Sequence, residues 1–289
     1  MSVRVFAPAK INLTLKVGRP RADGLHALQS VVMFADVGDV VEAAPGEELS
    51  LTISGEFAEG LGAGEDNLVL RAACALAEAA GIDNPSAALS LEKNLPIASG
   101  IGGGSSDAAA TLVALNELWA IGLLPSRLAE IALTLGADVP ACITAETVFM
   151  TGVGEKLQRM TSTPFAAVLV NPLIPLPTPN VYRQFDRMDL GTELSPSGSP
   201  HWSNPDAALR EIAALGNDLE PAARALLPEL DDIAAMMRAD RRVLHAGLSG
   251  SGATMFALVQ KAEHAEALAE TWQRAHPDWW VADTMLGAA

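Results

Sequence analysis

The most informative part of the chain reads Pro96-Ile97-Ala98-Ser99-Gly100-Ile101-Gly102-Gly103-Gly104-Ser105-Ser106-Asp107. Apolar residues follow it at helical intervals: Ala108, Leu112, Leu115 and Trp119. A backbone without Cβ atoms can take left-handed dihedral angles and approach a ligand closely. The start of a helix offers unpaired N–H groups and a partial positive charge. A glycine loop that runs into a helix is therefore a candidate polyphosphate site.

Two better-known phosphate motifs do not fit this loop. No lysine follows it, as G-x-x-x-x-G-K-[ST] would require, and the polar segment 92–96 before it does not suit the dinucleotide fingerprint. A simple turn therefore stays open beside a phosphate site. Ser105 and Ser106 also allow two roles, hydroxyl contacts to phosphate or Mg²⁺ and N-capping of the next helix.

Length and composition limit the class of protein. The chain has 289 residues, 49% of them apolar, which suits one large domain or two ordinary ones. Its net charge of −16 argues against nucleic acid or an anionic membrane as a partner. A small phosphorylated ligand is not excluded, because backbone amides and one or two cations can hold it.

The cysteines and the N-terminus indicate a reducing compartment. Cys74 and Cys142 stand far apart in apolar surroundings, so we expect buried free thiols. Cys and His show no metal-ligand spacing, and the first residues lack the apolar core of a signal peptide. No apolar run approaches the ~18 residues of a membrane span. We expect a cytoplasmic protein.

Periodicity predicts a mixture of helices and strands. The alternation of Ile11, Leu13, Leu15 and Val17 with polar residues predicts one half-buried strand. Further strands are expected near residues 3–5, 51–53, 89–91, 166–170, 254–259 and 280–281. Helices are expected from Asn67 to Gly81, from about Ser126 to Gly136, from Asn204-Pro205, and across 265–272. Without a clean βαβ rhythm, an α+β fold is favoured. Phe6, Trp119 and Trp272 are expected in the core.

Three further segments accompany the glycine loop: Ala7-Pro8-Ala9-Lys10-Ile11-Asn12-Leu13, Leu135-Gly136-Ala137-Asp138-Val139-Pro140 and Ala246-Gly247-Leu248-Ser249-Gly250-Ser251-Gly252-Ala253. In this order and at these separations they resemble the GHMP kinase superfamily of small-molecule kinases. The resemblance covers essentially the whole chain. It implies an α+β fold of two lobes, with an ATP-binding domain over residues 1–155, a second domain over 156–289, and the active site between the lobes.

Two shorter motifs narrow the resemblance, Asp23-Gly24-Leu25-His26 and Asn217-Asp218-Leu219-Glu220. They resemble the branch that acts on a cytidylated methylerythritol in non-mevalonate isoprenoid synthesis. The implied activity is phosphorylation of the 2-hydroxyl of that polyol by ATP with Mg²⁺. The implied partners are small molecules alone, with no nucleic acid and no membrane, and the chain is expected as a monomer or homodimer.

The resemblance also implies catalytic residues. Asp138 would be the general base and Lys10 its partner, whereas spacing alone equally allows a turn-forming aspartate and a solvated lysine. A carboxylate in reach can take the proton of an attacking alcohol, and an ammonium can stabilise developing negative charge. ATP would be held by Pro96, Ile97, Ala98, Ser99, Gly100, Ile101, Gly102, Gly103, Gly104, Ser105 and Ser106, with Ser105 as a possible contact of the Mg²⁺ that ATP carries.

The implied contacts of the cytidine are Asn12, Leu25, His26 and Tyr182. The family commonly has tyrosine where this chain has Leu25, which can cover a base but loses a stacking term of roughly 1–3 kcal/mol. Tyr182 would then line the other side of the base. Gly250, in the second glycine loop, would either close over the substrate diphosphate or allow close packing, and both readings stay open.

Two rival functions remain at this stage. One is another GHMP kinase, such as a mevalonate or homoserine kinase, and Asp23-Gly24-Leu25-His26 argues against it. The other is a non-catalytic ligand-binding protein on the same fold. The presence of both Lys10 and Asp138 argues against that, because a binding protein needs no base directed at a hydroxyl.

Overall fold

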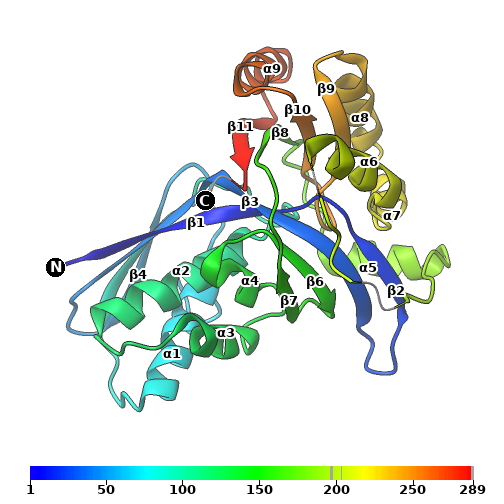
Figure 1. Cartoon of the computed structure of the whole chain (residues 1–289). Coiled ribbons are helices and arrows are strands. Elements are labelled where there is room, and N and C mark those ends of the chain that lie inside the picture. Colours follow the sequence, from blue (N-terminus) through cyan, green and yellow to red (C-terminus); the bar gives the residue numbers. More distant parts are fainter. Residues whose placement is uncertain (196–197, 203, 288–289) are drawn as a thin grey trace. The chain divides into compact units, whose positions relative to one another are not determined.

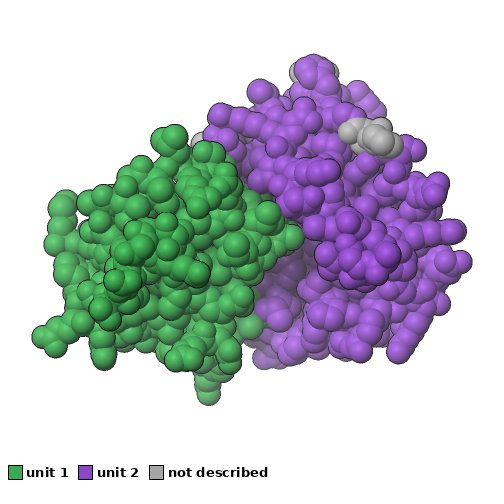
Figure 2. Space-filling view, turned by 90° about the horizontal axis from the view of Figure 1, so that it is seen from below, with its two compact units in different colours: residues 1–9, 37–97, 102–145 green, residues 10–36, 98–101, 146–289 purple. Residues whose placement is uncertain are grey.

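The computed structural model describes residues 1–195, 198–202 and 204–287, in which helices and strands follow one another irregularly (Figure 1). The chain forms two compact units, coloured separately in Figure 2. Unit 1 comprises residues 1–9, 37–97 and 102–145, and unit 2 comprises 10–36, 98–101 and 146–289. Each unit is thus assembled from separate segments. The division into family domains at residue 155 stays a prediction.

Unit 1 is a small sheet with four helices. Its strands are the first part of β1 (Val3–Asn12), the second part of β3 (His26–Ala44), β4 (Leu49–Ser54) and β5 (Ala87–Glu92). Strands β4 and β5 are parallel, and β5 pairs antiparallel with β3 from Val40 to Ala44. The helices are α1 (Leu68–Ala80), α2 (Gly103–Leu118), α3 (Pro125–Leu133) and α4 (Val139–Thr144). Helix α2 packs against α1, α3 and α4.

The ends of these helices can be compared with the capping residues predicted from the sequence. Helix α1 begins after Asn67, whose side chain accepts from the Val69 amide, and it ends at Gly81 with φ of 69°, as predicted. Helix α2 begins at Gly103, so the serines are not its caps as one reading had it. Helix α3 stops at Leu133. The chain then resumes as α4, with Pro140 in the first turn, where the missing N–H costs nothing.

Unit 2 contains an antiparallel sheet in the order β11-β8-β10-β9. The first part of β3 pairs with β2 (Lys16–Pro20) and β6 (Val148–Gly152), and β6 pairs with β7 (Lys156–Arg159). The other strands are β8 (Phe165–Asn171), β9 (Val243–Leu248), β10 (Met255–Val259) and β11 (Trp280–Leu286). The helices are α5 (Thr178–Arg187), α6 (Pro205–Leu215), α7 (Glu220–Leu226), α8 (Glu229–Ala239) and α9 (Ala262–Ala275).

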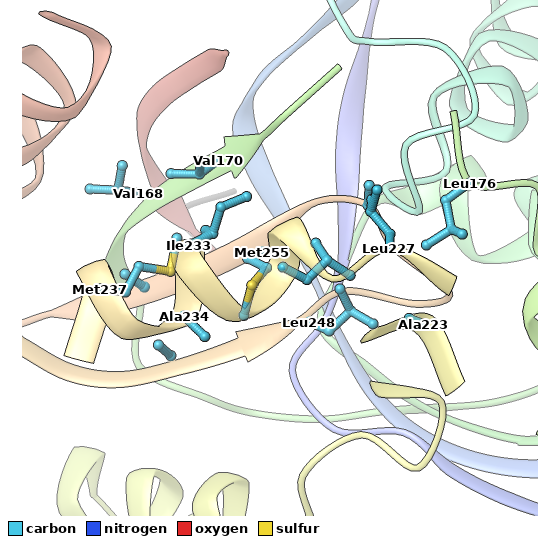
Figure 3. Packing of buried hydrophobic residues seen from close by; sticks show 14 of the residues in the cluster. Val168, Val170, Leu176, Ala223, Leu227, Ile233, Ala234, Met237, Leu248 and Met255 are labelled. Carbon is cyan, nitrogen blue, oxygen red and sulfur yellow. The ribbon is translucent and has the colours of Figure 1, made fainter. Parts of the chain in front are cut away.

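The core of unit 2 explains why β8 reads as an uninterrupted apolar run. All seven of its residues are buried, with α9 packed against the strand and α8 against β9 and β10 of the same sheet. Figure 3 shows Ile233 and Met237 of α8 close to Met255 of β10. Leu, Ile, Val, Ala and Met supply most of this core, as a chain poor in aromatic residues requires.

Several expectations were wrong in detail. The single strand over 11–17 is broken between β1 and β2, and Thr14 inside it is buried because its hydroxyl accepts from the Val31 amide at 3.0 Å. Phe6 is 47% exposed and Cys74 is exposed, whereas Trp272 and Cys142 are buried as expected. Trp119 is half-buried. The α+β class itself is confirmed. Among the described residues, no helix has the length and apolar character to cross a bilayer.

Unit 1 also buries a cluster of charges that sequence analysis did not find. Lys93 donates from Nζ to Asp39 Oδ2 and, at 2.8 Å, to Asp107 Oδ2. Each of the three residues is at most 3% exposed. We call this set the ion triad. None of the described residues forms a hydrogen bond with Asp107 Oδ1, so one buried oxygen of this side chain is unsatisfied within that part of the chain.

The protonation of the ion triad follows from burial and charge. Burial raises the pKa of Asp107 to about 7, opposed by the Lys93 ammonium and reinforced by the Asp39 carboxylate. For Lys93, burial lowers the pKa, but the two carboxylates together outweigh it and leave the pKa raised. Lys93 is therefore charged at neutral pH.

We expect Asp107→Asn to remove a pH-dependent loss of stability. The Asp107 carboxyl keeps its proton in the folded chain up to about 7 but loses it near 3.8 when unfolded. Between these values the unfolded state is favoured increasingly as the pH rises. The free energy of unfolding of the wild type, relative to the variant, should therefore fall across this window and level off above it. Urea titrations at several pH values measure it, and a level or rising difference would contradict the assignment.

Candidate functional site

The middle of the first glycine loop lies against the second glycine loop within unit 2. Gly100 has φ of +75°, and a Cβ atom there would lie 2.5 Å from the Gly252 carbonyl oxygen. Gly250 has φ of +54°, and its Cβ would lie 2.8 Å from the Gly100 oxygen. Both distances are shorter than any side chain tolerates, so this approach requires glycine on both segments. Close packing is thus one role of Gly250, while a contact to diphosphate stays a prediction.

Ser249 connects these loops to the first strand. Its hydroxyl donates to the Gly100 carbonyl at 3.1 Å and accepts from the Asn12 amide at 3.2 Å. The Lys10 amide donates to the Ile101 carbonyl at 2.8 Å. Strand β1 therefore runs beside residues 98–101, and unit 2 brings Lys10 and Asn12 together with both glycine loops.

The side chains of Lys10 and Asn12 are buried and oriented. Lys10 is 3% exposed, and its Nζ donates to Asn12 Oδ1 at 3.4 Å. Asn12 Nδ2 donates to Ser30 Oγ at 2.7 Å, and that hydroxyl donates to the Thr14 carbonyl at 2.6 Å. This chain of contacts fixes the Asn12 amide with its oxygen toward the ammonium. Lys10 is thus not the solvated lysine that spacing alone allowed.

Asn217 holds the second glycine loop in place. Its Nδ2 donates to the carbonyls of Leu248 and Gly250, both at 2.8 Å, and its Oδ1 accepts from the Leu219 amide at 2.9 Å. In the sequence, the motif that contains Asn217 indicates only a branch of the family, and no role was predicted for the residue itself. The signal in the sequence was that Asn217 directly precedes Asp218. In the structure, Asp218 accepts hydrogen bonds from the Lys16 side chain and the Val17 amide.

His26 and Tyr182 lie together elsewhere in unit 2. The ring centroids of the two residues are 5.0 Å apart, and Phe185 packs on His26 edge-on at 5.9 Å. His26 Nδ1 lies 2.9 Å from the Gly18 carbonyl oxygen, which can only accept, so Nδ1 carries a proton. The second ring nitrogen, Nε2, is 3.5 Å from Asp186 Oδ1. No motif in the sequence singles out Asp186.

Leu25 stands at the tip of a turn beside His26. Its side chain is 51% exposed, its amide donates to Asp23 Oδ1 at 3.0 Å, and its carbonyl accepts from the Arg21 amide at 2.8 Å. Gly24 supplies the positive φ of 78° that the turn needs. Leu25 is therefore held by its backbone, and its side chain is open to solvent.

In unit 1, the first turn of α2 presents the end of the first glycine loop. The first intrahelical hydrogen bond runs from the Ser106 amide to the Gly102 carbonyl at 2.9 Å, so the amides of Gly103, Gly104 and Ser105 precede it. Ser106 is buried, and its hydroxyl donates to the Pro8 carbonyl at 2.6 Å. Ser105 is half-buried, and Gly104 is exposed. Of the two serines, Ser105 is the one with a solvent-accessible side chain.

The other predicted donor-site residues are placed as follows. Pro96 and Ile97 belong to unit 1, and Ala98, Ser99, Gly100 and Ile101 belong to unit 2. Ile97 is 44% exposed. The Ser99 carbonyl accepts from the Thr254 amide at 3.0 Å, which extends the contact with the second glycine loop.

Asp138 occupies the position before α4 in unit 1. It is half-buried, and its carboxylate does not cap the helix, so capping does not account for an aspartate there. Its carbonyl accepts from Cys142 Sγ at 3.4 Å. Lys10 belongs to unit 2. Among the residues that the structure describes, no three His, Cys, Asp or Glu side chains are grouped to hold a metal ion.

Comparisons with known proteins identify the family. Residues 67–146 match the model of the GHMP kinases N terminal domain, and residues 200–278 match the GHMP kinases C terminal model. A 4-diphosphocytidyl-2-C-methyl-D-erythritol kinase of Cereibacter sphaeroides is 47% identical over 278 residues, which are 96% of each chain. One of Hyphomonas neptunium is 44% identical and covers 100% of this chain and 98% of its own.

Solved structures agree with these relatives. A crystal structure of 4-(cytidine 5'-diphospho)-2C-methyl-D-erythritol kinase superposes with a TM-score of 0.78 at 33% identity, over 99% of this chain and 100% of that one. A mevalonate kinase of L. major superposes with a TM-score of 0.72 at 18% identity, over 99% and 97% of the chains, which shows the fold alone. With relatives this similar over nearly its whole length, the chain belongs to the GHMP kinase family.

Proposed function

We propose that this chain transfers the γ-phosphoryl group of ATP, carried with Mg²⁺, to the 2-hydroxyl of 4-diphosphocytidyl-2-C-methyl-D-erythritol. The products are the 2-phosphate and ADP, in the non-mevalonate synthesis of isoprenoid precursors. The observation that carries the proposal is the cluster of Lys10 and Asn12 on both glycine loops, in a chain whose relatives of that name match over nearly its whole length. With these soluble substrates, the reaction would take place in the cytoplasm.

The ATP phosphates would lie at the first glycine loop, from Pro96 to Ser106. The amides that precede the first intrahelical bond of α2 are suited to bind phosphate oxygens, helped by the helix dipole. Ser105 would contact the Mg²⁺ that ATP carries, because its hydroxyl is the accessible one of the pair. The metal would neutralise charge on the transferred phosphoryl group.

Asp138 would take the proton of the substrate hydroxyl as its oxygen attacks phosphorus. The Asp138 carboxylate does not cap helix α4, and a carboxylate within reach of an alcohol can accept its proton. Lys10 would stabilise the negative charge that develops on the attacking oxygen, with its ammonium oriented by the Asn12 amide. The buried position of Lys10 makes this electrostatic effect stronger than it would be in water.

The cytidine base would bind at His26 and Tyr182, with Leu25 and Asn12 as further contacts. His26 Nδ1 is engaged with the Gly18 carbonyl, so Nε2 is the ring nitrogen that would face the exocyclic amino group of the base. The Tyr182 ring, 5.0 Å from His26, offers a surface for stacking. Gly250 would present the second glycine loop to the substrate diphosphate.

The direct test is whether ADP forms only when the alcohol substrate is present. Purified protein with MgATP is assayed against 4-diphosphocytidyl-2-C-methyl-D-erythritol, mevalonate and homoserine, and the product is identified by ³¹P NMR. Turnover with the cytidylated substrate alone is the expected result. Turnover with mevalonate or homoserine instead would replace the proposal with a related kinase, and tight binding without any turnover would indicate a non-catalytic protein.

Asp138→Asn should abolish most turnover while MgATP binding is retained. The amide cannot accept the hydroxyl proton, and general-base catalysis typically contributes about 10²–10⁴-fold to the rate. Asp83→Asn, which changes an exposed carboxylate in the same unit, is the matched control and should keep wild-type kcat. Steady-state kinetics and calorimetry measure both quantities. A near-normal kcat for Asp138→Asn would remove it from the mechanism.

His26→Ala should raise the KM for the cytidylated substrate and leave the KM for ATP almost unchanged. The lost hydrogen bond and the lost contact with Tyr182 should weaken binding of the cytidylated substrate only, because ATP binds at a different site. His276→Ala is the control, because that histidine also stacks on an aromatic ring, Trp279, at 3.7 Å. Each substrate is varied separately. A raised ATP KM with an unchanged acceptor KM would refute the assignment of the base site.

A further inference from the structure

We propose that the ion triad of Asp39, Lys93 and Asp107 positions the first glycine loop for ATP, because it links the chain segments at the two ends of that loop. The inference rests on the proposed function of that loop. It adds three positioning residues, none of which touches the substrates. The contacts of the ion triad with both ends of the loop lie within unit 1.

Asp39 holds the start of the loop. Its Oδ1 accepts from the backbone amides of Asn94 at 2.6 Å and Leu95 at 2.8 Å, directly before Pro96. Asp39 is fully buried in β3, which pairs with β5, so its carboxylate is a fixed point. Two charge-assisted bonds to successive amides define the direction in which the chain leaves β5.

Asp107 and Gly103 connect the same cluster to the end of the loop. Lys93 Nζ donates to Asp107 in the first turns of α2. A Cβ atom at Gly103, the first residue of α2, would lie only 3.0 Å from Nζ. The ammonium therefore lies directly beneath the helix start. One ammonium, bound at once to Asp39 and Asp107, joins the segment before the loop to the segment after it.

Stability alone accounts poorly for this arrangement. Buried ion pairs can often be replaced by apolar side chains without loss of stability. Here one oxygen of Asp107 is unsatisfied, and an ammonium lies near the positive end of a helix dipole. The contacts do have a geometric consequence, because they set where the first amides of α2 point. Displacement of such donors by about 1 Å is enough to weaken binding or catalysis substantially.

The test compares two substitutions of one residue. Asp107→Asn keeps an oxygen that accepts from Lys93, and Asp107→Ala removes it while the Lys93–Asp39 pair stays intact. We expect the MgADP dissociation constant, measured by calorimetry, to rise at least tenfold in Asp107→Ala and less than threefold in Asp107→Asn. The KM for the acceptor substrate should stay within twofold in both. Equal MgADP affinities for the two variants would overturn the proposal.

Two further variants keep the result decisive. Gly103→Ala preserves every charge but presses a Cβ against the ammonium, so it should also weaken MgADP binding severalfold. If Asp107→Ala does not fold, wild-type affinity in folded Gly103→Ala overturns the proposal. Arg224→Met is the control, since Arg224 also bridges two carboxylates, Glu220 and Asp231, in unit 2. It should leave MgADP affinity unchanged, and a matching loss there would show a nonspecific effect and refute the proposal.

This experiment separates the inference from the proposed function. If the wild type binds MgADP but phosphorylates a different alcohol, the donor-site measurements still decide the role of the ion triad. If the wild type binds neither MgADP nor MgATP, the proposed donor site fails and the inference fails with it.

Discussion

The approach of two glycine-rich segments, 98–101 and 249–252, is the constraint on which the candidate site of unit 2 depends. Gly100 and Gly250 bring backbone atoms to distances that a Cβ would forbid. Ser249 then reaches both the Gly100 carbonyl and the Asn12 amide, which aligns β1 with the first glycine loop. The positions of Lys10 and Asn12 follow from that alignment.

Buried polar side chains carry much of the order around these loops. Asn12, Thr14 and Ser30 bond to one another or to nearby backbone, and Asn217 holds two carbonyls of the second loop. Such networks are costly when incomplete and rigid when complete. Asn12 and Thr14, two of the polar positions in the segment 11–17, are buried for this reason, and a pattern of alternating polar and apolar residues could not show it.

The site proposed for the nucleobase has a different character. His26 is buried and held by a backbone carbonyl, whereas Leu25, next to it in sequence, is exposed at the tip of a turn. The aromatic surface near His26 comes from Tyr182 and Phe185, far along the chain on α5. A side-chain change from the family pattern at Leu25 therefore alters an exposed position and leaves the support of His26 intact.

Local signals in the sequence determined the elements and the family motifs. Asn67, Gly81 and the apolar periodicity predicted helix ends and strands, because caps and burial patterns act over a few neighbouring residues. The tertiary structure alone decided which polar residues meet. Asp39 lies 54 residues before its partner Lys93, and Asp186 far beyond His26, so no spacing rule links them. A buried charge is explained by its partners in space, and only the folded chain brings those partners together.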